Sequence, residues 1–341
     1  MRRILGILLV VILLSGCSLT TVDSGPRTED IGPQTTDGGP VTEPSATVNG
    51  LPSMATMGDC PLFPADNFWN TPVDGLPVHP LSEAWVDSIG RGTGFHMDFG
   101  SGEWDGGPIG IPYNVVGAGT PMFPFDFYYP DESDPGPYPI PEGYLREWGS
   151  DHHILVVDTS TCTLYETYDA WEEDGQWFGG SGALWDLGAN DLRPAGWTSA
   201  DAAGLPILPG LARYDEVAAG EIRHALRFTA SSTNGYIWPA RHLTSDEDAP
   251  GIPPMGARFR LRADYDISGF PPELQVLLRA IKTYGIVLAD NGSDWYVSGA
   301  PDERWDNDML HQLDILTGDD FEAVDTSILM VNPDSGQARL P

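Results

Sequence analysis

Residues 153–168 read HILVVDTSTCTLYETY, and two apolar-rich runs, His153–Asp158 and Thr163–Tyr168, flank a short polar stretch. Short runs rich in valine, isoleucine, threonine and tyrosine are typical of β-strands. Such runs recur along the 341 residues, separated by frequent proline and glycine. The pattern predicts further strands at Gln176–Phe178, Ile222–Ala230, Tyr236–Trp238, Arg258–Ala263, Ile286–Ala289 and Trp295–Ser298.

A few segments have helical signals instead. Pro272–Tyr284 carries apolar residues at helical spacing, begins with proline and is followed by Gly285 as a stop. Thr198–Ala203 has a capping-box arrangement, and a weaker third helix covers Asp306–Leu313. The sequence therefore predicts a mostly-β (α+β) domain, specifically an antiparallel, jelly-roll-like β-sandwich with a few short helices and long loops. The proline-rich residues 112–144 are predicted to be one such loop, without regular structure.

The first residues, MRRILGILLVVILLSGCS, have the layout of a secretory signal, and their apolar run is too short for a permanent membrane span. The ending LSGC resembles the lipobox of bacterial lipoproteins, in which the cysteine, here Cys17, is acylated. An ordinary signal peptide with an unrelated cysteine is the alternative. Ser18 follows in place of the aspartate that retains lipoproteins at the inner membrane. The resemblance thus implies a signal peptide over residues 1–16 and an acyl anchor in the lipid bilayer of the cell envelope, at the outer membrane or the outer face of the cell membrane.

Residues 17–58 contain mostly threonine, proline, glycine, serine and aspartate, which cannot bury enough apolar surface to order the chain. They are predicted to be a disordered tether, and residues 59–341 a single globular β-rich domain. Two cysteines remain, Cys60 and Cys162. In an oxidising compartment they are expected to form a disulfide, with buried free thiols as the alternative.

The net charge excludes one large class of partners. Fifty acidic residues against 17 lysines and arginines give −33 at pH 7, and so acidic a surface repels nucleic-acid phosphates. The chain contains no P-loop, no GxSxG serine elbow, no HExxH helix and no CxxC pair. The sequence therefore assigns no cofactor and no metal, although His96 and Asp98 would share one face of a strand and could bind a metal together with His152 or His153. Structural or surface histidines are the favoured alternative there.

Basic and aromatic residues suggest a surface for sugars. In ARFRLRA (257–263) the arginines alternate with apolar residues, so one strand face is cationic. Neighbouring carboxylates would neutralise that face, or it would form a trough for an anionic glycan, which guanidinium groups bind bidentately. Tryptophans beside polar residues suit stacking on sugar rings, although most tryptophans in such a domain belong to its core. The candidate substrate-binding residues are Arg227, Arg241, His242, Trp238, Trp197 and Trp295.

The stretch YDEVAAGEIRHALRF (214–228) carries the candidate catalytic residues. A strand over 222–229 would place His224 on its apolar face and Arg227 on the opposite face. Burial would keep the histidine neutral, as a general base requires. Glu216 and Asp290 would orient His224 or act as a second acid. A hydrogen-bonded core histidine is the alternative.

The segments GWTSADAAGLPILPGLARYDEVAAGEIRHALRF (196–228), YIWPARH (236–242), PPMGARFRL (253–261) and IKTYGIVLADNGSDWYVSGAPDERWD (281–306) resemble a family of uncharacterised secreted bacterial proteins. The resemblance spans nearly all of residues 60–327 and implies no particular activity. The leading hypothesis is a surface-anchored lipoprotein that is a carbohydrate-active enzyme, a hydrolase or lyase, acting on extracellular glycans, anionic ones included. The alternatives are an envelope lipoprotein that binds glycans or partners without catalysis, and a purely structural envelope protein.

Overall fold

The computed structural model describes residues 56–340. The predicted signal peptide, the predicted acylation site Cys17 and nearly all of the predicted tether lie outside the described residues. Within the described residues, no helix is long and apolar enough to cross a membrane. The first two described residues already form a strand, β1 (Thr56–Met57), which pairs with β2 (Cys60–Pro61).

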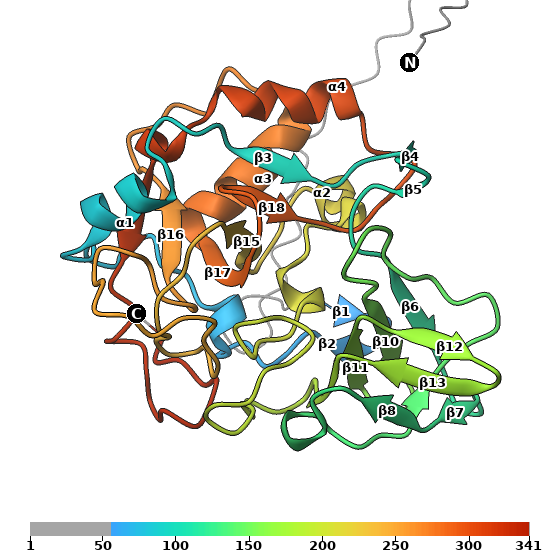
Figure 1. Ribbon diagram of the computed structural model, residues 1–341. Coiled ribbons are helices and arrows are strands. Elements are labelled where there is room, and N and C mark those ends of the chain that lie inside the picture. Colours follow the sequence, from blue (N-terminus) through green and yellow to red (C-terminus); the bar gives the residue numbers. More distant parts are fainter. Residues whose placement is uncertain (1–55, 341) are drawn as a thin grey trace, which may run out of the picture. The chain divides into compact units, whose positions relative to one another are not determined.

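The mostly-β prediction is confirmed (Figure 1). The largest sheet has six strands, in the order β19 (Phe321–Val324), β16 (Arg258–Leu261), β17 (Ile286–Asn291), β15 (Leu226–Ala230), β18 (Tyr296–Ser298) and β3 (His96–Asp98). A second sheet has the order β14 (Ser181–Asp186), β11 (Thr163–Tyr168), β10 (Ile154–Asp158) and β6 (Tyr113–Val116).

The remaining strands form smaller sheets. One has three strands, in the order β12 (Trp171–Glu173), β13 (Gln176–Gly179) and β8 (Phe125–Phe127). Two are antiparallel pairs: β4 (Glu103–Trp104) forms a hairpin with β5 (Gly107–Pro108), and β7 (Met122–Phe123) pairs with β9 (Tyr138–Pro139). Parallel pairs occur in three of the sheets, between β6 and β10, β8 and β13, β15 and β17, and β3 and β18. The sheets are therefore mixed, a feature that apolar alternation along a single strand does not encode.

The helices are few and short. They are α1 (Ser82–Ile89), α2 (Tyr214–Ala219), α3 (Pro272–Thr283) and α4 (Asn307–Leu310), with 3-10 turns at η1 (Phe68–Asn70), η2 (Pro130–Glu132), η3 (Leu208–Gly210), η4 (His311–Ile315) and η5 (Gly318–Asp320). The apolar face of α3 packs on β16, and α1 packs on β19, which buries the core around Phe228, Phe259 and Trp295. Helix α2 ends at Gly220, whose φ of 87° is the left-handed conformation that glycine adopts without strain.

Most predicted elements are confirmed within a few residues, and three are wrong. Tyr236–Trp238 makes only a single bridge to Met255, because Pro239 follows and cannot donate a ladder hydrogen bond. Thr198–Ala203 is a turn, since the Ser199 hydroxyl bonds to nearby backbone groups in place of a helical ladder. Residues 112–144 contain four strands and one 3-10 turn, with the prolines at strand ends and turns.

The Cys60–Cys162 disulfide is present, as predicted. It joins residues 102 apart in sequence and ties β2 to the residue that precedes β11. Because a cross-link over so long a loop restricts the unfolded chain strongly, we expect its reduction to lower the free energy of unfolding by about 2–5 kcal/mol. Urea unfolding with and without reductant measures this change. A Cys60→Ala/Cys162→Ala protein should be insensitive to reductant, and equal unfolding midpoints for the oxidised and reduced wild type would contradict the expectation.

Candidate functional site

An open cavity of about 700 Å³ lies where β3, β15, β17 and β18 of the largest sheet meet the β4–β5 hairpin, residues 147–153 and the turn formed by α4 and η4. Its wall contains six acidic residues and a single arginine, Arg227. The acidic residues are Asp98, Asp105, Glu147, Asp151, Asp290 and Asp314. The three histidines of the wall are His96, His153 and His311. A second, smaller cavity, beside Arg213 and Asp302, contains fewer titratable groups.

The floor of the cavity contains a buried arginine held by two aspartates. Arg227 extends from β15, and its Nε and Nη2 donate to the two carboxylate oxygens of Asp201 at 2.8 and 2.7 Å. The same Nη2 donates to Asp290 Oδ2 at 3.1 Å, and Nη1 donates to the Ser298 hydroxyl. Asp290 lies on the parallel neighbour β17, next to a bulge after Phe228. One guanidinium therefore serves two carboxyl groups.

The surroundings of Asp290 favour the protonated form of its carboxyl group. Burial raises the pKa of this carboxyl, and the negative charge of Asp201 raises it further, while Arg227 lowers it. The resulting pKa is about 8. Arg227 is bound bidentately by Asp201 and makes only one, longer hydrogen bond to Asp290, so it stabilises the charged form of Asp201 more than that of Asp290. Asp290 thus keeps its proton while part of its side chain faces the cavity.

Glu147 and His153 form a second buried pair in the wall. His153 Nδ1 lies 2.5 Å from Glu147 Oε2, and His153 Nε2 lies 2.9 Å from the Ala200 carbonyl oxygen. A carbonyl can only accept, so Nε2 carries a hydrogen, and a proton on Nδ1 makes the ring an imidazolium. Burial alone would lower the pKa of His153, but Glu147 outweighs it and raises this pKa to about 9. Burial would likewise raise the pKa of Glu147, but His153 holds it below its ordinary value.

These shifts predict how stability depends on pH. A group whose pKa is higher in the folded state stabilises the fold fully below its unfolded pKa, and this contribution is lost as the pH rises through the folded value. His153 is raised from 6.5 to about 9 and Asp290 from 3.8 to about 8. The loss from Asp290 extends from about pH 4 to about pH 8 and that from His153 from about pH 6.5 to about pH 9, so we expect the free energy of unfolding to fall from about pH 6.5, where both contribute, to about pH 9. Urea unfolding across this window measures it, and a rise in stability would contradict the assignment.

Aromatic side chains line the mouth of the cavity. Trp104 is 77% exposed and Trp148 is 50% exposed. Trp104 precedes the turn of the β4–β5 hairpin, where Asp105 and Gly106 both have positive φ, as a tight hairpin of this type requires. The Trp148 ring packs on Gly107, where any side chain would overlap it, and donates to the Asp105 carbonyl at 2.9 Å. Two tryptophan rings are thus held at the mouth of the cavity.

The predicted catalytic residues are not brought together as one group. His224 Nε2 lies 3.1 Å from Glu216 Oε2, while Glu216 is also paired with Arg213. This buried pair does not belong to the cavity wall. Asp290 contacts Arg227 instead, so the expectation that it would partner His224 is corrected. The reason is that His224 precedes the strand: β15 begins at Leu226, and the alternation argument does not apply to it.

Most of the predicted substrate-binding residues make structural contacts within the domain. Trp295 is fully buried and stacks on Phe228, so it offers no face to a sugar. The buried guanidinium of Arg241 donates to the Arg193 and Pro333 carbonyl oxygens and to Asp334. Three others are partly buried and lie outside the cavity wall: Trp238 donates to the Ser335 carbonyl, Trp197 stacks on Arg193, and His242 contacts the Ala202 carbonyl. Arg227 alone lines the cavity.

The cationic strand face in β16 is also occupied. Arg258 donates to the carbonyl oxygens of Phe68, Thr71 and Tyr284. Arg260 donates to Glu322 and to three carbonyl oxygens between residues 73 and 76. Both side chains are buried, and for Arg258 this burial lowers the pKa to about 9. Arg258 and Arg260 therefore anchor residues 68–76 to β16, and they form no trough for an anion.

Several cavity residues carry no sequence signal of their own. Glu147, His311 and Asp314 belong to loops or short turns, and only the fold places them beside β3 and β17. Trp104 was detectable, since it directly precedes Asp105-Gly106, the dipeptide most typical of a tight hairpin. No protein-family model, no curated protein and no solved structure matches this chain. The geometry of the cavity is therefore the basis for a functional proposal.

Proposed function

We propose that this protein is a surface-anchored lipoprotein whose cavity cleaves an extracellular glycan by acid–base chemistry. The observation that carries the proposal is the pair of carboxyl groups in the wall with opposite protonation. The pKa of Asp290 is raised to about 8, whereas that of Glu147 is held low by His153. Surroundings that raise the pKa of one carboxyl group and lower the pKa of another are typical of the acid and the base of one reaction.

The two groups have complementary roles in this scheme. Asp290 donates its proton to the glycosidic oxygen as one of that oxygen's bonds breaks: the bond to the anomeric carbon in a hydrolase, or the bond to the ring carbon of the neighbouring sugar in a lyase. The carboxylate of Glu147 accepts a proton from the attacking water in a hydrolase, or from a ring carbon in a lyase. Both contacts of Glu147 with His153 use the same oxygen, Oε2. Arg227 and Asp201 hold Asp290 in position.

The charge of the cavity wall indicates the substrate class. Asp290 keeps its proton, but five other acidic residues line the wall, and its two cations, Arg227 and the His153 imidazolium, are already paired with Asp201 and Glu147. A uronate or sulfated chain would be repelled by this wall, whereas an uncharged glycan or one with amino groups would not. We therefore favour a neutral or amino-bearing polysaccharide over the anionic one that the arginine-rich sequence suggests. The exposed rings of Trp104 and Trp148 supply apolar faces for its sugar units.

Binding without catalysis is the second candidate, and the exposed tryptophans favour it. A panel of neutral, amino-bearing and uronate polysaccharides distinguishes the two candidates. Release of new reducing ends from a neutral or amino-bearing member supports the enzyme. Retention on such a polysaccharide without any cleavage identifies a binding protein, and neither binding nor cleavage would overturn both candidates.

Trp104→Ala tests the role of the cavity mouth. Because this ring offers its face to solvent, and a bound sugar unit would remove that apolar face from water, we expect its removal to weaken polysaccharide binding by about 1–3 kcal/mol. The loss should appear in Kd, or in KM with kcat nearly unchanged. Tyr128→Ala is the matched control, since Tyr128 is 79% exposed and lies outside the cavity wall. Equal affinities for the Trp104→Ala and Tyr128→Ala proteins would exclude a role for Trp104.

A further inference from the structure

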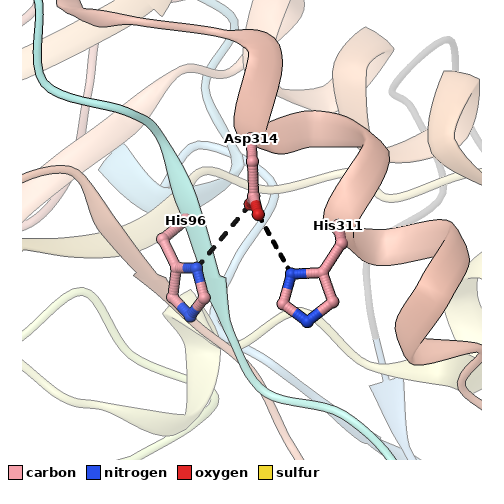
Figure 2. Close-up of side chains that lie close together, drawn as sticks. All are labelled: His96, His311 and Asp314. Carbon is pink, nitrogen blue, oxygen red and sulfur yellow. Dashed lines mark hydrogen bonds and ion pairs between the residues drawn. The ribbon is translucent and has the colours of Figure 1, made fainter.

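We propose that His96, His311 and Asp314 bind a divalent transition-metal ion at the cavity. One potential ligand atom from each residue lies within 4.8 Å of the other two. His96 Nδ1 is 3.7 Å from Asp314 Oδ1, and His311 Nδ1 is 3.0 Å from Asp314 Oδ2. Figure 2 shows the two imidazole rings on either side of the carboxylate, each with a nitrogen directed at it. All three residues also belong to the cavity wall.

The three side chains are presented by ordered backbone. His96 lies in β3, where its N–H donates to the Trp295 carbonyl at 3.0 Å and its ring packs against Tyr296. His311 and Asp314 are three residues apart in η4, a spacing that places them on the same side of the turn. Each directly follows a buried leucine, Leu310 or Leu313, and these leucines anchor the turn in the core. A metal would thus need little rearrangement to bind.

The ligand set indicates the kind of ion. Imidazole nitrogens suit zinc and its first-row neighbours, whereas calcium and magnesium prefer oxygen ligands throughout. Two histidines and one carboxylate leave at least one coordination position for water or another ligand, as in catalytic rather than structural zinc sites. Because the residues line the cavity, this open position is accessible from it. Asp98, two residues after His96 on the same strand, also lines the cavity.

The alternative for this cluster is a pair of histidine–aspartate contacts without a metal. In that case the single carboxylate of Asp314 would contact both imidazole rings, whose centroids lie 6.1 Å apart. The chain contains a matched example of such a contact elsewhere: His152 Nδ1 lies 3.0 Å from Asp169 Oδ1, and no third ligand completes a metal-binding group there among the described residues. This second pair provides a control for the experiment.

Isothermal titration of the full chain with Zn²⁺ tests the proposal. Excess Mg²⁺ in the buffer occupies the weak sites that a net charge of −33 creates. We expect one saturable site per chain. Loss of an outer-shell partner already weakens metal affinity about 10–100-fold, so removal of a ligand in His311→Ala or Asp314→Asn should weaken it by about 100-fold or more. His311 is 60% exposed on its side chain, and circular dichroism verifies that each variant is folded.

The control variant is His152→Asn, which should bind Zn²⁺ with wild-type affinity; asparagine tolerates the positive φ of 48° at this position. Unchanged affinity in His311→Ala, equal losses in His311→Ala and His152→Asn, or no saturable binding by the wild type would each overturn the proposal. The binding measurement requires no substrate. Its failure is therefore distinct from the failure of the proposed glycan cleavage.

Discussion

Replacing Arg227 by methionine is expected to lower the free energy of unfolding by about 3–5 kcal/mol, because it leaves a buried carboxylate without its partner. Asp201 is fully buried, and both of its carboxylate oxygens accept from this guanidinium. Methionine approximates the volume of the arginine stem, so the loss of stability reflects the unpaired charge of Asp201 rather than a packing cavity. Urea unfolding of the two proteins at about pH 7 measures the difference.

Arg91→Met is the matched control for this loss. Arg91 makes three ion pairs, with Glu83, Asp87 and Asp319, but these partners are exposed. Exposed pairs contribute little to stability, so we expect the unfolding midpoint of this variant to stay close to that of the wild type. Equal losses in the Arg227→Met and Arg91→Met proteins would show that the Arg227 cluster is not the electrostatic anchor of the cavity floor.

Asp290→Asn is expected to abolish most glycan cleavage while leaving the fold intact. Asparagine reproduces the shape and neutrality of a protonated carboxyl but has no proton to give, and general acid catalysis contributes about 10²–10⁴-fold to a rate. Near pH 4 or below, where this carboxyl is protonated in the folded and in the unfolded chain, the variant should unfold like the wild type. From there to about pH 8 it should become increasingly the more stable protein, because Asp290 of the wild type ionises in the unfolded chain but keeps its proton in the fold beside Asp201.

The control for this substitution is Asp294→Asn. Asp294 lies four residues further along and accepts from the Ser231 N–H, outside the cavity wall. Its removal should leave cleavage unchanged. If Asp290→Asn retains wild-type turnover, or if both variants lose it equally, Asp290 is not the general acid. The wild-type rate should also fall above about pH 8, as Asp290 loses its proton.

The local features of the fold were predictable from sequence, and the pairing of its strands was not. Thr163–Tyr168 and Pro272–Tyr284 have strong periodicity, and the structure places a strand and a helix there. The disulfide followed from the two cysteines that remain after Cys17. Between β15 and its parallel partner β17 the chain forms β16, which pairs antiparallel with β17, and then α3. No periodicity within a strand indicates its direction.

The site was less predictable, because it is assembled from distant segments. Asp290 was singled out from sequence, but its partner is Arg227, since the bulge in the β15–β17 pairing places both at the cavity floor. His224 was selected because it lies in an apolar run, and the same burial pairs it with Glu216 away from the cavity. His311 and Asp314 meet His96 only through tertiary structure. Residue spacing along the chain does not determine such contacts.

The central claim is that the cavity holds a carboxylic acid that remains protonated at neutral pH. Carbon-13 NMR titration of the aspartate carboxyl signals in the full chain tests it most directly, with the Asp290→Asn protein identifying the Asp290 signal by its loss. The account predicts a midpoint near pH 8 for this carboxyl. A midpoint near 4, the ordinary value for an aspartate, would contradict it.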